Sequence, residues 1–518
     1  MQTLTSYVQD RWIAGQGAAV PLFNATTEQP LAETRAGGID FAAVLKHARD
    51  VGGPALRALS FGERAALLMA LSKAIHAARE ELIELSVQNA GTTRSDAKFD
   101  IDGAIGTLAA YAGFGAALGA RRFLVDGAGV QLGRTARFWG EHVLVPRLGA
   151  AVHVNAFNFP AWNMLEKAAC ALLAGAPVIE KPGTPTALVA WRVAELVVQS
   201  GVLPAGAYQF VAGSVGDLLD HMGPQDSLAF TGSSATAAKL RGHANLVRQN
   251  VRINLEADSL NCAILGADVD SSADVYGTFL SNVALDISQK TGQKCTAVRR
   301  IFVPKDRVGD VRADLAAALS KLKVGDPAES DTRMGPLASA SQLRDVRAGI
   351  ERLAAHAEVA CGGAKPIREK GYFVAPTLLV ARGEHCGRDA AFHAEEVFGP
   401  CATILPYDGA PATACELAAL GGGGLVASLY SNDAATIEQV VLGLAPWHGR
   451  VWVGSDKLAD QGLPPGMVLP ASIHGGPGRA GGGEELGGLR GLAFYLQRTA
   501  VQGFKGYVES SFGCAPGA

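Results

Sequence analysis

Residues 150–181 read AAVHVNAFNFPAWNMLEKAACALLAGAPVIEK, and this stretch indicates how the chain folds. It predicts a short strand, a helix and a second strand, and the same alternation continues beyond it. The expected strands are 150–155, 176–181, 208–212 and 227–231, and the expected helices are 165–173, 187–199 and one near 235. Strands and helices that alternate at this pace are typical of a parallel, doubly wound sheet.

On either side of this stretch, other patterns of apolar residues predict other kinds of structure. Residues 60–119 have apolar residues at three- and four-residue spacing and predict helix. A second α/β series begins near residue 263 and continues to about residue 470. Two extended segments, 131–147 and the tail after Gly491, lie outside the alternating pattern. We expect them to form an oligomerisation arm.

The composition narrows the class of protein. A chain of 518 residues is long enough for two or three domains, and 48% hydrophobic residues suffice for a large core. The net charge of −3 argues against a nucleic-acid surface. No apolar run or signal-like N-terminus indicates a membrane or secretion. Eight cysteines without metal-like pairs predict reduced thiols in a cytoplasm and no metal site.

Three side chains far apart in the sequence carry the groups needed to oxidise an aldehyde through a thioester. Cys295 lies in Thr291-Gly-Gln-Lys-Cys-Thr-Ala-Val-Arg-Arg300, Glu256 precedes Ala-Asp-Ser, and Asn158 lies in Asn155-Ala-Phe-Asn-Phe-Pro160. A thiolate attacks the carbonyl carbon, an amide donates to the oxyanion, and a carboxylate moves protons and activates water. The alternatives are a buried structural cysteine and a surface carboxylate, which single residues of these types usually are.

The order and local contexts of these residues resemble the aldehyde dehydrogenase superfamily, over about residues 1 to 507. The resemblance implies an α/β fold with two doubly wound parallel-sheet domains and a small β oligomerisation arm. It assigns the cofactor domain to 1–130 and 148–262, the catalytic domain to 263–470, and the arm to 131–147 and 490–518.

The resemblance also adds residues to the expected site. Lys167 matches a family lysine beside the nicotinamide ribose and the general base, and Glu485 matches a glutamate proposed to pass protons to solvent. Glu166 replaces a commonly aromatic position and is an alternative proton acceptor to Glu256, unless Glu166 and Lys167 are only a helix-surface pair. Which of the two carboxylates is the principal base stays open.

Several segments together indicate a bound cofactor, although the usual GxGxxG fingerprint is absent from the sequence. Phe230-Thr-Gly-Ser-Ser234 leads from a strand into a helix, where free amides can bind an anion. With the positions that the family resemblance adds, the expected cofactor residues are Lys181, Thr184, Lys167, Gly213, Gly216, Gly232, Ser233, Glu396 and Phe398. NAD-preferring family members often carry a glutamate where this chain has Thr184. Without that carboxylate Lys181 can pair with a 2′-phosphate, which favours NADP and leaves NAD possible.

The substrate is implied by resemblance alone. At Ala257-Asp258-Ser259 this chain departs from the usual sequence of the family. A subgroup acting on coenzyme A-linked semialdehydes from aromatic ring cleavage is similar in this segment and in the stretch His474-Gly-Gly-Pro-Gly-Arg-Ala-Gly-Gly-Gly-Glu-Glu-Leu. The expected reaction is oxidation of 3,4-didehydroadipyl-CoA semialdehyde to the acid by a homodimer or higher homo-oligomer. Related two-domain enzymes continue into a hydratase, an activity not expected here. The alternatives are a coenzyme A-acylating dehydrogenase and a catalytically silent binding protein of the same fold.

Overall fold

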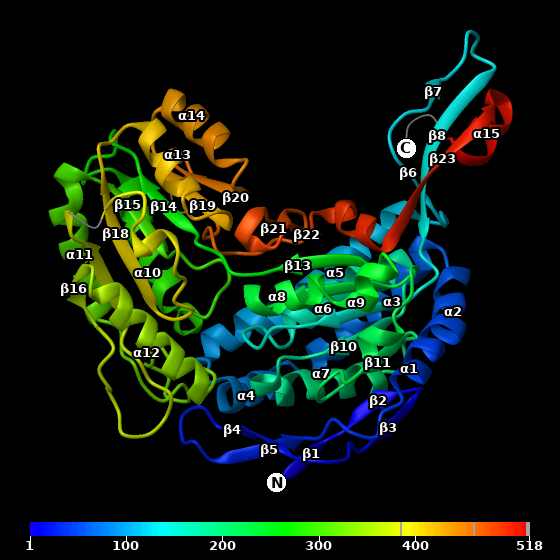
Figure 1. Ribbon diagram of the computed structural model, residues 1–518, viewed down its shortest axis with the longest axis horizontal. Helices are drawn as coiled ribbons and strands as arrows, with labels where there is room; N and C mark the ends of the chain where they lie inside the picture. The colour runs from blue at the N-terminus through cyan, green and yellow to red at the C-terminus, as the bar shows by residue number, and fades with distance from the viewer. Residues whose placement is uncertain (384–385, 459–460, 514–518) are drawn as a thin grey trace.

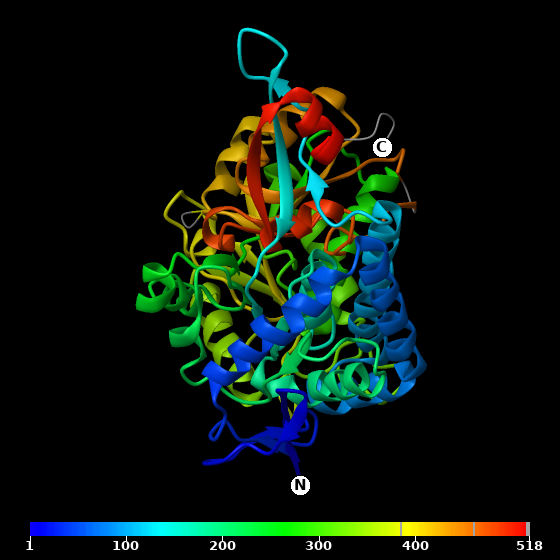
Figure 2. The same ribbon diagram turned by 90° about the vertical axis from the view of Figure 1, so that its right-hand side faces the viewer.

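The computed structural model describes residues 1–383, 386–458 and 461–513. Two α/β lobes lie side by side, and an antiparallel arm projects away from them (Figures 1 and 2). The chain enters through a small sheet of β1, β5 and β4, at the bottom of Figure 1. The bounds of these strands are Gln2–Leu4 for β1, Val20–Phe23 for β4 and Pro30–Thr34 for β5.

The first lobe is built on a seven-stranded sheet in the order β13-β12-β9-β10-β11-β2-β3. The five strands from β13 to β11 are parallel, and the short β2 and β3 add an antiparallel edge. The strand bounds are β2 Ser6–Val8, β3 Arg11–Ile13, β9 Ala151–Val154, β10 Val178–Lys181, β11 Tyr208–Phe210, β12 Ser227–Thr231 and β13 Arg252–Glu256. The helix bounds are α1 Phe41–His47, α2 Gly53–Ala58, α3 Phe61–Ala77, α4 Arg79–Ala90, α5 Arg94–Leu118, α6 Trp162–Ala174, α7 Ala187–Gln199, α8 Ser234–Arg241 and α9 Ala244–Arg248.

The second lobe contains another seven-stranded sheet, in the order β16-β17-β18-β15-β14-β19-β20. Only β16 is antiparallel to its neighbour. The strand bounds are β14 Cys262–Leu265, β15 Arg300–Pro304, β16 Ala357–Cys361, β17 Thr377–Ala381, β18 Cys401–Tyr407, β19 Gly424–Tyr430 and β20 His448–Gly454. The helix bounds are α10 Asp274–Ser288, α11 Val308–Ser320, α12 Ala340–Ala354, α13 Pro411–Ala419 and α14 Ala434–Leu444.

The arm joins two distant parts of the chain. The long strand β8 (Phe138–Pro146) pairs antiparallel with β23 (Leu496–Phe504) over its whole length, and α15 (Lys505–Phe512) packs beside them. Two short strands, β6 (Leu124–Val125) and β7 (Val130–Gln131), also pair with β8. The cyan β8 and the red β23 lie together at the right of Figure 1.

These observations confirm the predicted fold class of two parallel-sheet units and a small β arm. The domain ranges themselves stay a prediction, and residues 514–518 of the expected arm lie outside the described residues. The arm sheet also takes in β6, which those ranges assign to the cofactor domain. The strand expected from Leu492 begins only at Leu496, because Gly488–Tyr495 winds into a 3-10 helix after Gly487 and Gly488, both with positive φ.

Helix α5 is long and apolar enough, by length and composition, to cross a membrane. In the structure it packs against α3, α4 and α6. The buried carboxylate of Asp100 on α5 accepts the backbone N–H groups of Ala161 (3.3 Å) and Trp162 (2.8 Å) at the start of α6. These contacts are those of a core helix that fixes the position of α6.

Parallel strands bring distant residues to one edge of the first sheet. Thr231 at the end of β12 pairs with Glu256 at the end of β13, and Lys181 at the end of β10 pairs with Val154 on β9. In open α/β sheets, ligands bind beyond the carboxyl ends of the strands. The functional site is therefore expected at this edge, where the second lobe faces the first.

Candidate active site

Cys295 lies in a tightly held loop between α10 and β15. The carbonyl of Cys295 accepts the side-chain amide of Asn261 at 2.7 Å. Its neighbour Lys294 is buried, and Nζ of Lys294 donates to Asp286 at 2.7 Å and to Gln289 at 2.8 Å. The flanking residues are thus fixed by the protein, while the thiol faces the cavity.

The loop reaches this position through three successive residues in the left-handed region. Lys290, Thr291 and Gly292 have φ angles of 52°, 56° and 66°. The Thr291 hydroxyl donates to the carbonyl of Gly335 at 2.9 Å, which helps to hold the turn. A Cβ on Gly292 would lie 2.2 Å from the carbonyl oxygen of Gly399, so this position requires glycine.

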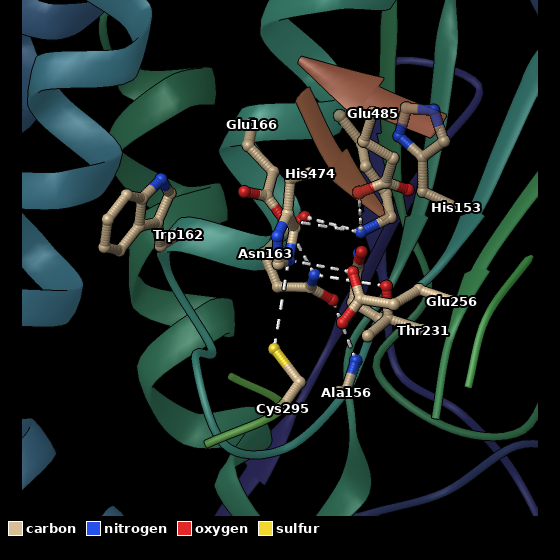
Figure 3. Close-up of polar contacts among 12 residues, drawn as sticks. His153, Ala156, Trp162, Asn163, Glu166, Thr231, Glu256, Cys295, His474 and Glu485 are labelled. Atoms are coloured by element: carbon tan, nitrogen blue, oxygen red, sulfur yellow. Dashed lines mark hydrogen bonds and ion pairs between the residues drawn. The ribbon is translucent and has the colours of Figure 1, made fainter. Parts of the chain in front are cut away.

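Three reactive groups meet beside this loop (Figure 3). His474 Nε2 lies 3.8 Å from Cys295 Sγ and 3.0 Å from Glu256 Oε2, and the reactive atoms of all three side chains lie within 4.8 Å of one another. Asn158 lines the same cavity, and its side-chain amide donates to the carbonyl of Gln293 at 3.0 Å. Because an amide nitrogen carries two hydrogens, a second donor remains for an oxyanion.

The carboxylate and the imidazole stabilise each other's charge. Burial alone would raise the pKa of Glu256, but the charge of His474 and the contact with it outweigh burial, so the pKa falls to about 2. Burial alone would lower the pKa of His474, but Glu256 raises it above its ordinary value. Burial, and then the Glu256 carboxylate, raise the pKa of the Cys295 thiol well above its ordinary value. The resting site therefore holds a protonated thiol beside an ion pair.

A second charged cluster lies behind the first. Lys167 Nζ is 3.3 Å from Glu485 and 3.6 Å from Glu166, and all three side chains are buried. The Glu166 carboxylate accepts the side-chain amide of Asn163 at 2.9 Å. Burial raises the pKa of Glu166 to about 7 despite the charge of Lys167. Glu166 can thus exchange a proton near neutral pH.

A short hairpin, β21 (Ile473–Gly476) and β22 (Gly483–Leu486), brings in two of these side chains. His474 and Glu485 are directly opposite each other in its register. Asn254 on β13 donates to the Glu485 carboxylate at 3.2 Å and accepts the backbone N–H of Glu484 at 2.9 Å. These bonds tie the hairpin to the strand that carries Glu256.

A small pocket, of about 380 Å³ when its solvent-open space is included, opens onto the thiol. Its walls include Phe99, Phe159, Trp162 and Val468. Phe99 and Phe159 both stand edge-on to the Trp162 ring, with ring centroids 5.3 Å and 5.9 Å from it. The cavity therefore offers an apolar surface for the carbon chain of a substrate, with the reactive groups at its inner end.

A larger cleft, of about 1370 Å³ including its open side, reaches Cys295 from the other direction. The expected cofactor residues Lys181, Gly232, Ser233, Glu396 and Phe398 all line it. Burial lowers the pKa of Lys181, and no described residue pairs with this ammonium group as an ion. A half-buried cation in a cleft that reaches the thiol fits the phosphate groups of a dinucleotide.

The comparisons with known proteins agree with this geometry. The model of the aldehyde dehydrogenase family matches residues 12–501. The chain belongs to the aldehyde dehydrogenase family. It is 44% identical to 3,4-dehydroadipyl-CoA semialdehyde dehydrogenase of Aromatoleum evansii, over 92% of this chain and 93% of that one. It is 28% identical to mouse 4-trimethylaminobutyraldehyde dehydrogenase, over 87% and 86%. The NAD⁺ complex of the Bacillus cereus aldehyde dehydrogenase superposes with a TM-score of 0.84, 25% identity and 97% coverage of each chain.

The dehydrogenase brings all five expected catalytic side chains together, although their roles stay predictions. These are Cys295, Glu256, Asn158, Glu166 and Glu485. Of the expected cofactor residues, Lys167 lies in the charged cluster behind the thiol. Thr184, Gly213 and Gly216 are outside the residues that line the cleft.

One expectation about the cofactor cleft needs correction. The Ser234 amide at the start of α8 is not free, because it donates to the Asp258 carboxylate at 2.9 Å. The Ser233 hydroxyl accepts the N–H of Thr236 at 3.3 Å. This helix start is thus already capped, and Asp258 places a negative charge in the cleft.

Sequence analysis also gave no role to His474, which contacts both Glu256 and Cys295. A histidine directly before Gly475-Gly476, in the same glycine-rich stretch as Glu485, was the available signal. The signal is weak, because only the folded hairpin shows that His474 and Glu485 are opposite each other.

Proposed function

We propose that this dehydrogenase oxidises a coenzyme A-linked semialdehyde, 3,4-dehydroadipyl-CoA semialdehyde, to the acid with NADP as oxidant. The proposed chemistry rests on one observation: Cys295, Glu256 and Asn158 lie together where the apolar cavity joins the cofactor cleft. The substrate class is supported by the 44% identity with a relative named for that substrate.

The first half of the proposed reaction forms a bond between sulfur and carbon. Glu256 accepts the proton of the Cys295 thiol, and Sγ attacks the aldehyde carbon. The free hydrogen of the Asn158 amide, together with the backbone N–H of Cys295, stabilises the oxyanion of the resulting hemithioacetal. A nicotinamide dinucleotide bound in the cleft supplies the acceptor for the hydride of this carbon, which leaves a thioester on Cys295.

The second half releases the acid. Glu256, or alternatively Glu166, takes a proton from water, and the water oxygen attacks the thioester carbon. The bond between carbon and Sγ breaks, and the thiolate regains a proton. Lys167 and Glu485 lie behind both carboxylates and are placed to pass the excess proton outward.

The preference for NADP is supported by charge. Lys181 is a half-buried ammonium group that lines the cleft and has no ion partner among the described residues. The carboxylate that NAD-preferring relatives often carry is replaced by Thr184 in the 3-10 turn Thr184–Thr186 directly after the Lys181 strand. A 2′-phosphate near Lys181 would therefore meet an attractive charge, and Thr184 adds no repulsive one.

We further propose that the chain works as a homodimer or higher homo-oligomer in the cytoplasm. The arm supports self-association, because it projects from the lobes (Figure 1) and its residues Phe138, Phe504 and Tyr507 are exposed. The reduced state expected of a cytoplasm is supported by Cys170, Cys262 and Cys401, which are buried thiols without disulfides.

The test is an assay of the purified chain with a panel of aldehydes, including coenzyme A-linked semialdehydes, and with both cofactors. We expect reduced NADP and a free acid in equal amounts, and a loss of at least about a hundredfold in Cys295→Ala with cofactor binding retained. A new thioester as product would indicate transfer to coenzyme A. Activity of Cys295→Ala above a hundredth of wild type would exclude Cys295 as the nucleophile.

A further inference from the structure

We propose that His474 is a positioning residue that holds the Glu256 carboxylate in place beside the Cys295 thiol. The proposal rests on the proposed function, because it assumes that Glu256 is the base for Cys295. Nε2 of His474 lies 3.0 Å from Glu256 Oε2 and 3.8 Å from Cys295 Sγ, so one nitrogen faces both partners.

The surroundings of the imidazole support a role at the site rather than in the core. His474 is buried, with 4% of its surface exposed, yet the described residues offer Nδ1 no hydrogen-bond partner. Both polar contacts of the ring are made by Nε2, and both are with Glu256 or Cys295. A buried histidine that only stabilised the fold would be expected to use both ring nitrogens.

The carboxylate in turn depends on this imidazole. Glu256 has 1% of its surface exposed, and the described residues offer neither of its oxygens a hydrogen-bond partner. Its ion-pair contact with His474 Nε2, at 3.0 Å, is therefore the contact that balances its charge most directly. Lys167 also lowers the pKa of Glu256, but less than His474 does. Without His474, burial would favour the protonated acid, which cannot act as a base.

The hairpin makes the contact possible. Gly475, directly after His474, has a φ of +133°, and a Cβ there would lie 2.1 Å from the carbonyl oxygen of Gly483. The two strands of the hairpin can therefore approach closely only with glycine at this position. On this hairpin, the His474 side chain points toward Glu256 at the end of β13 (Figure 3).

The charged and titratable groups that face the pair come from every side of the site. They are Cys295 before β15, Glu166 and Lys167 on α6, Glu485 on β22 and Arg450 on β20. Glu166 and Glu256 raise the pKa of His474, and Arg450 lowers it. Of these groups, His474 has the largest effect in keeping Glu256 ionised.

The test uses His474→Phe, which keeps a ring without nitrogen, and His474→Gln, which keeps a side-chain donor without charge. We expect His474→Phe to lose at least about tenfold in kcat at pH 6 and to recover toward wild type by pH 9. The recovery follows because the buried acid loses its proton as the pH rises. His474→Gln should lie between wild type and His474→Phe. A chelator in every assay excludes any contribution from a metal ion bound by thiol, imidazole and carboxylate.

Two controls separate positioning from a loss of structure. His448→Phe removes another buried histidine, and its pH profile should keep the shape of the wild-type profile. In a Glu256→Gln background, His474→Phe should change kcat by less than about twofold, because its partner is already gone. Superimposable profiles for wild type and His474→Phe, or a further tenfold loss in the Glu256→Gln background, would overturn the proposal. An inactive wild type, or an active Cys295→Ala, would instead count against the proposed function.

Discussion

At the residue scale, two buried carboxylates share one cavity but differ in their neighbours. Glu256 faces the imidazole of His474, which lowers its pKa to about 2. Glu166 accepts an amide hydrogen bond from Asn163 and lies 3.6 Å from Lys167 Nζ, yet burial raises its pKa to about 7. Glu256 is therefore ionised at every working pH, whereas Glu166 exchanges its proton near neutrality. Replacing each carboxylate with an uncharged side chain should therefore affect the reaction differently.

Glu256→Gln should slow release of the acid more than formation of the thioester, because an amide cannot activate water. A rapid burst of reduced cofactor should precede a steady state at least about tenfold slower than wild type. Stopped-flow absorbance separates the two phases, and Glu166→Ala is the matched comparison. If Glu166→Ala gives the burst and Glu256→Gln does not, the roles of the two carboxylates are reversed.

The charge at residue 184 should decide the choice of cofactor. Thr184 lies between Gly183 and Pro185, which line the cofactor cleft. We expect Thr184→Glu to bring a carboxylate near the 2′-phosphate of NADP and to offer acceptors to the ribose hydroxyls of NAD. Like charges in a cleft cost on the order of a few kcal/mol, so the ratio of kcat/KM for NADP over NAD should fall at least about tenfold. An unchanged ratio would place residue 184 away from the ribose. A wild type that already prefers NAD would contradict the proposed cofactor.

At the element scale, the start of α8 shows how a loop changes what a helix can bind. The N-terminus of a helix attracts anions, but Asp258 already accepts the Ser234 amide at 2.9 Å. The unusual segment Ala257-Asp258-Ser259 and the expected anion site at α8 are both visible in the sequence, but the contact between them is not. Their contact depends on the end of β13 lying against α8, which sequence spacing does not show. Asp258 also contributes to a raised pKa of Glu396 across the cleft.

Asp258→Asn should strengthen binding of the cofactor by about three- to tenfold, because one negative charge no longer faces the phosphates. The side-chain oxygen of asparagine can still accept the Ser234 amide, so the loss of stability should stay within about 1 kcal/mol. Titration calorimetry with NADP and a thermal melt measure the two effects. Weaker binding would show that the Asp258 carboxylate itself contacts the cofactor.

The sequence predicted regular elements well and their contacts poorly. The alternation around 150–181 was enough for the first sheet, because each strand and helix there has a clear apolar pattern. The tail was harder, since Leu492-Ala-Phe-Tyr reads as a strand but forms a 3-10 helix, and only Leu496 onward pairs with β8. The position of His474 had only a weak signal in the sequence, because its contact with Cys295 depends on how the folded hairpin packs against the thiol loop.

At the scale of the whole molecule, the arm presents an apolar surface to solvent. Phe138 and Phe504 are paired across β8 and β23 and are 46% and 53% exposed, and Tyr507 on α15 is 76% exposed. Exposed apolar residues gathered on a projecting sheet are typical of an interface between subunits. The lobes carry their own cores, so the arm is free to serve assembly.

The double variant Phe138→Asp with Phe504→Asp should shift the oligomer toward monomer, because two charges would have to be buried in the interface. Leu442→Asp is the matched control, since Leu442 is exposed and its helix α14 lies far from the arm (Figure 1). Size-exclusion chromatography with light scattering gives the mass of each. An unchanged mass for the double variant would place the interface elsewhere.

Because β8 pairs with β23, β8 has no partner strand for part of the time during which the chain is synthesised. Pro146 and Leu496 are register partners, and the nearby contact from Arg147 to Gln497 spans 350 residues. At about 5–20 residues per second, the ribosome needs roughly 20–70 s between the two strands. Throughout that interval the long β8 edge has no β23 to cover it, and an uncovered strand edge is a template for aggregation. We therefore expect the nascent chain to depend on chaperones until its last strand is made.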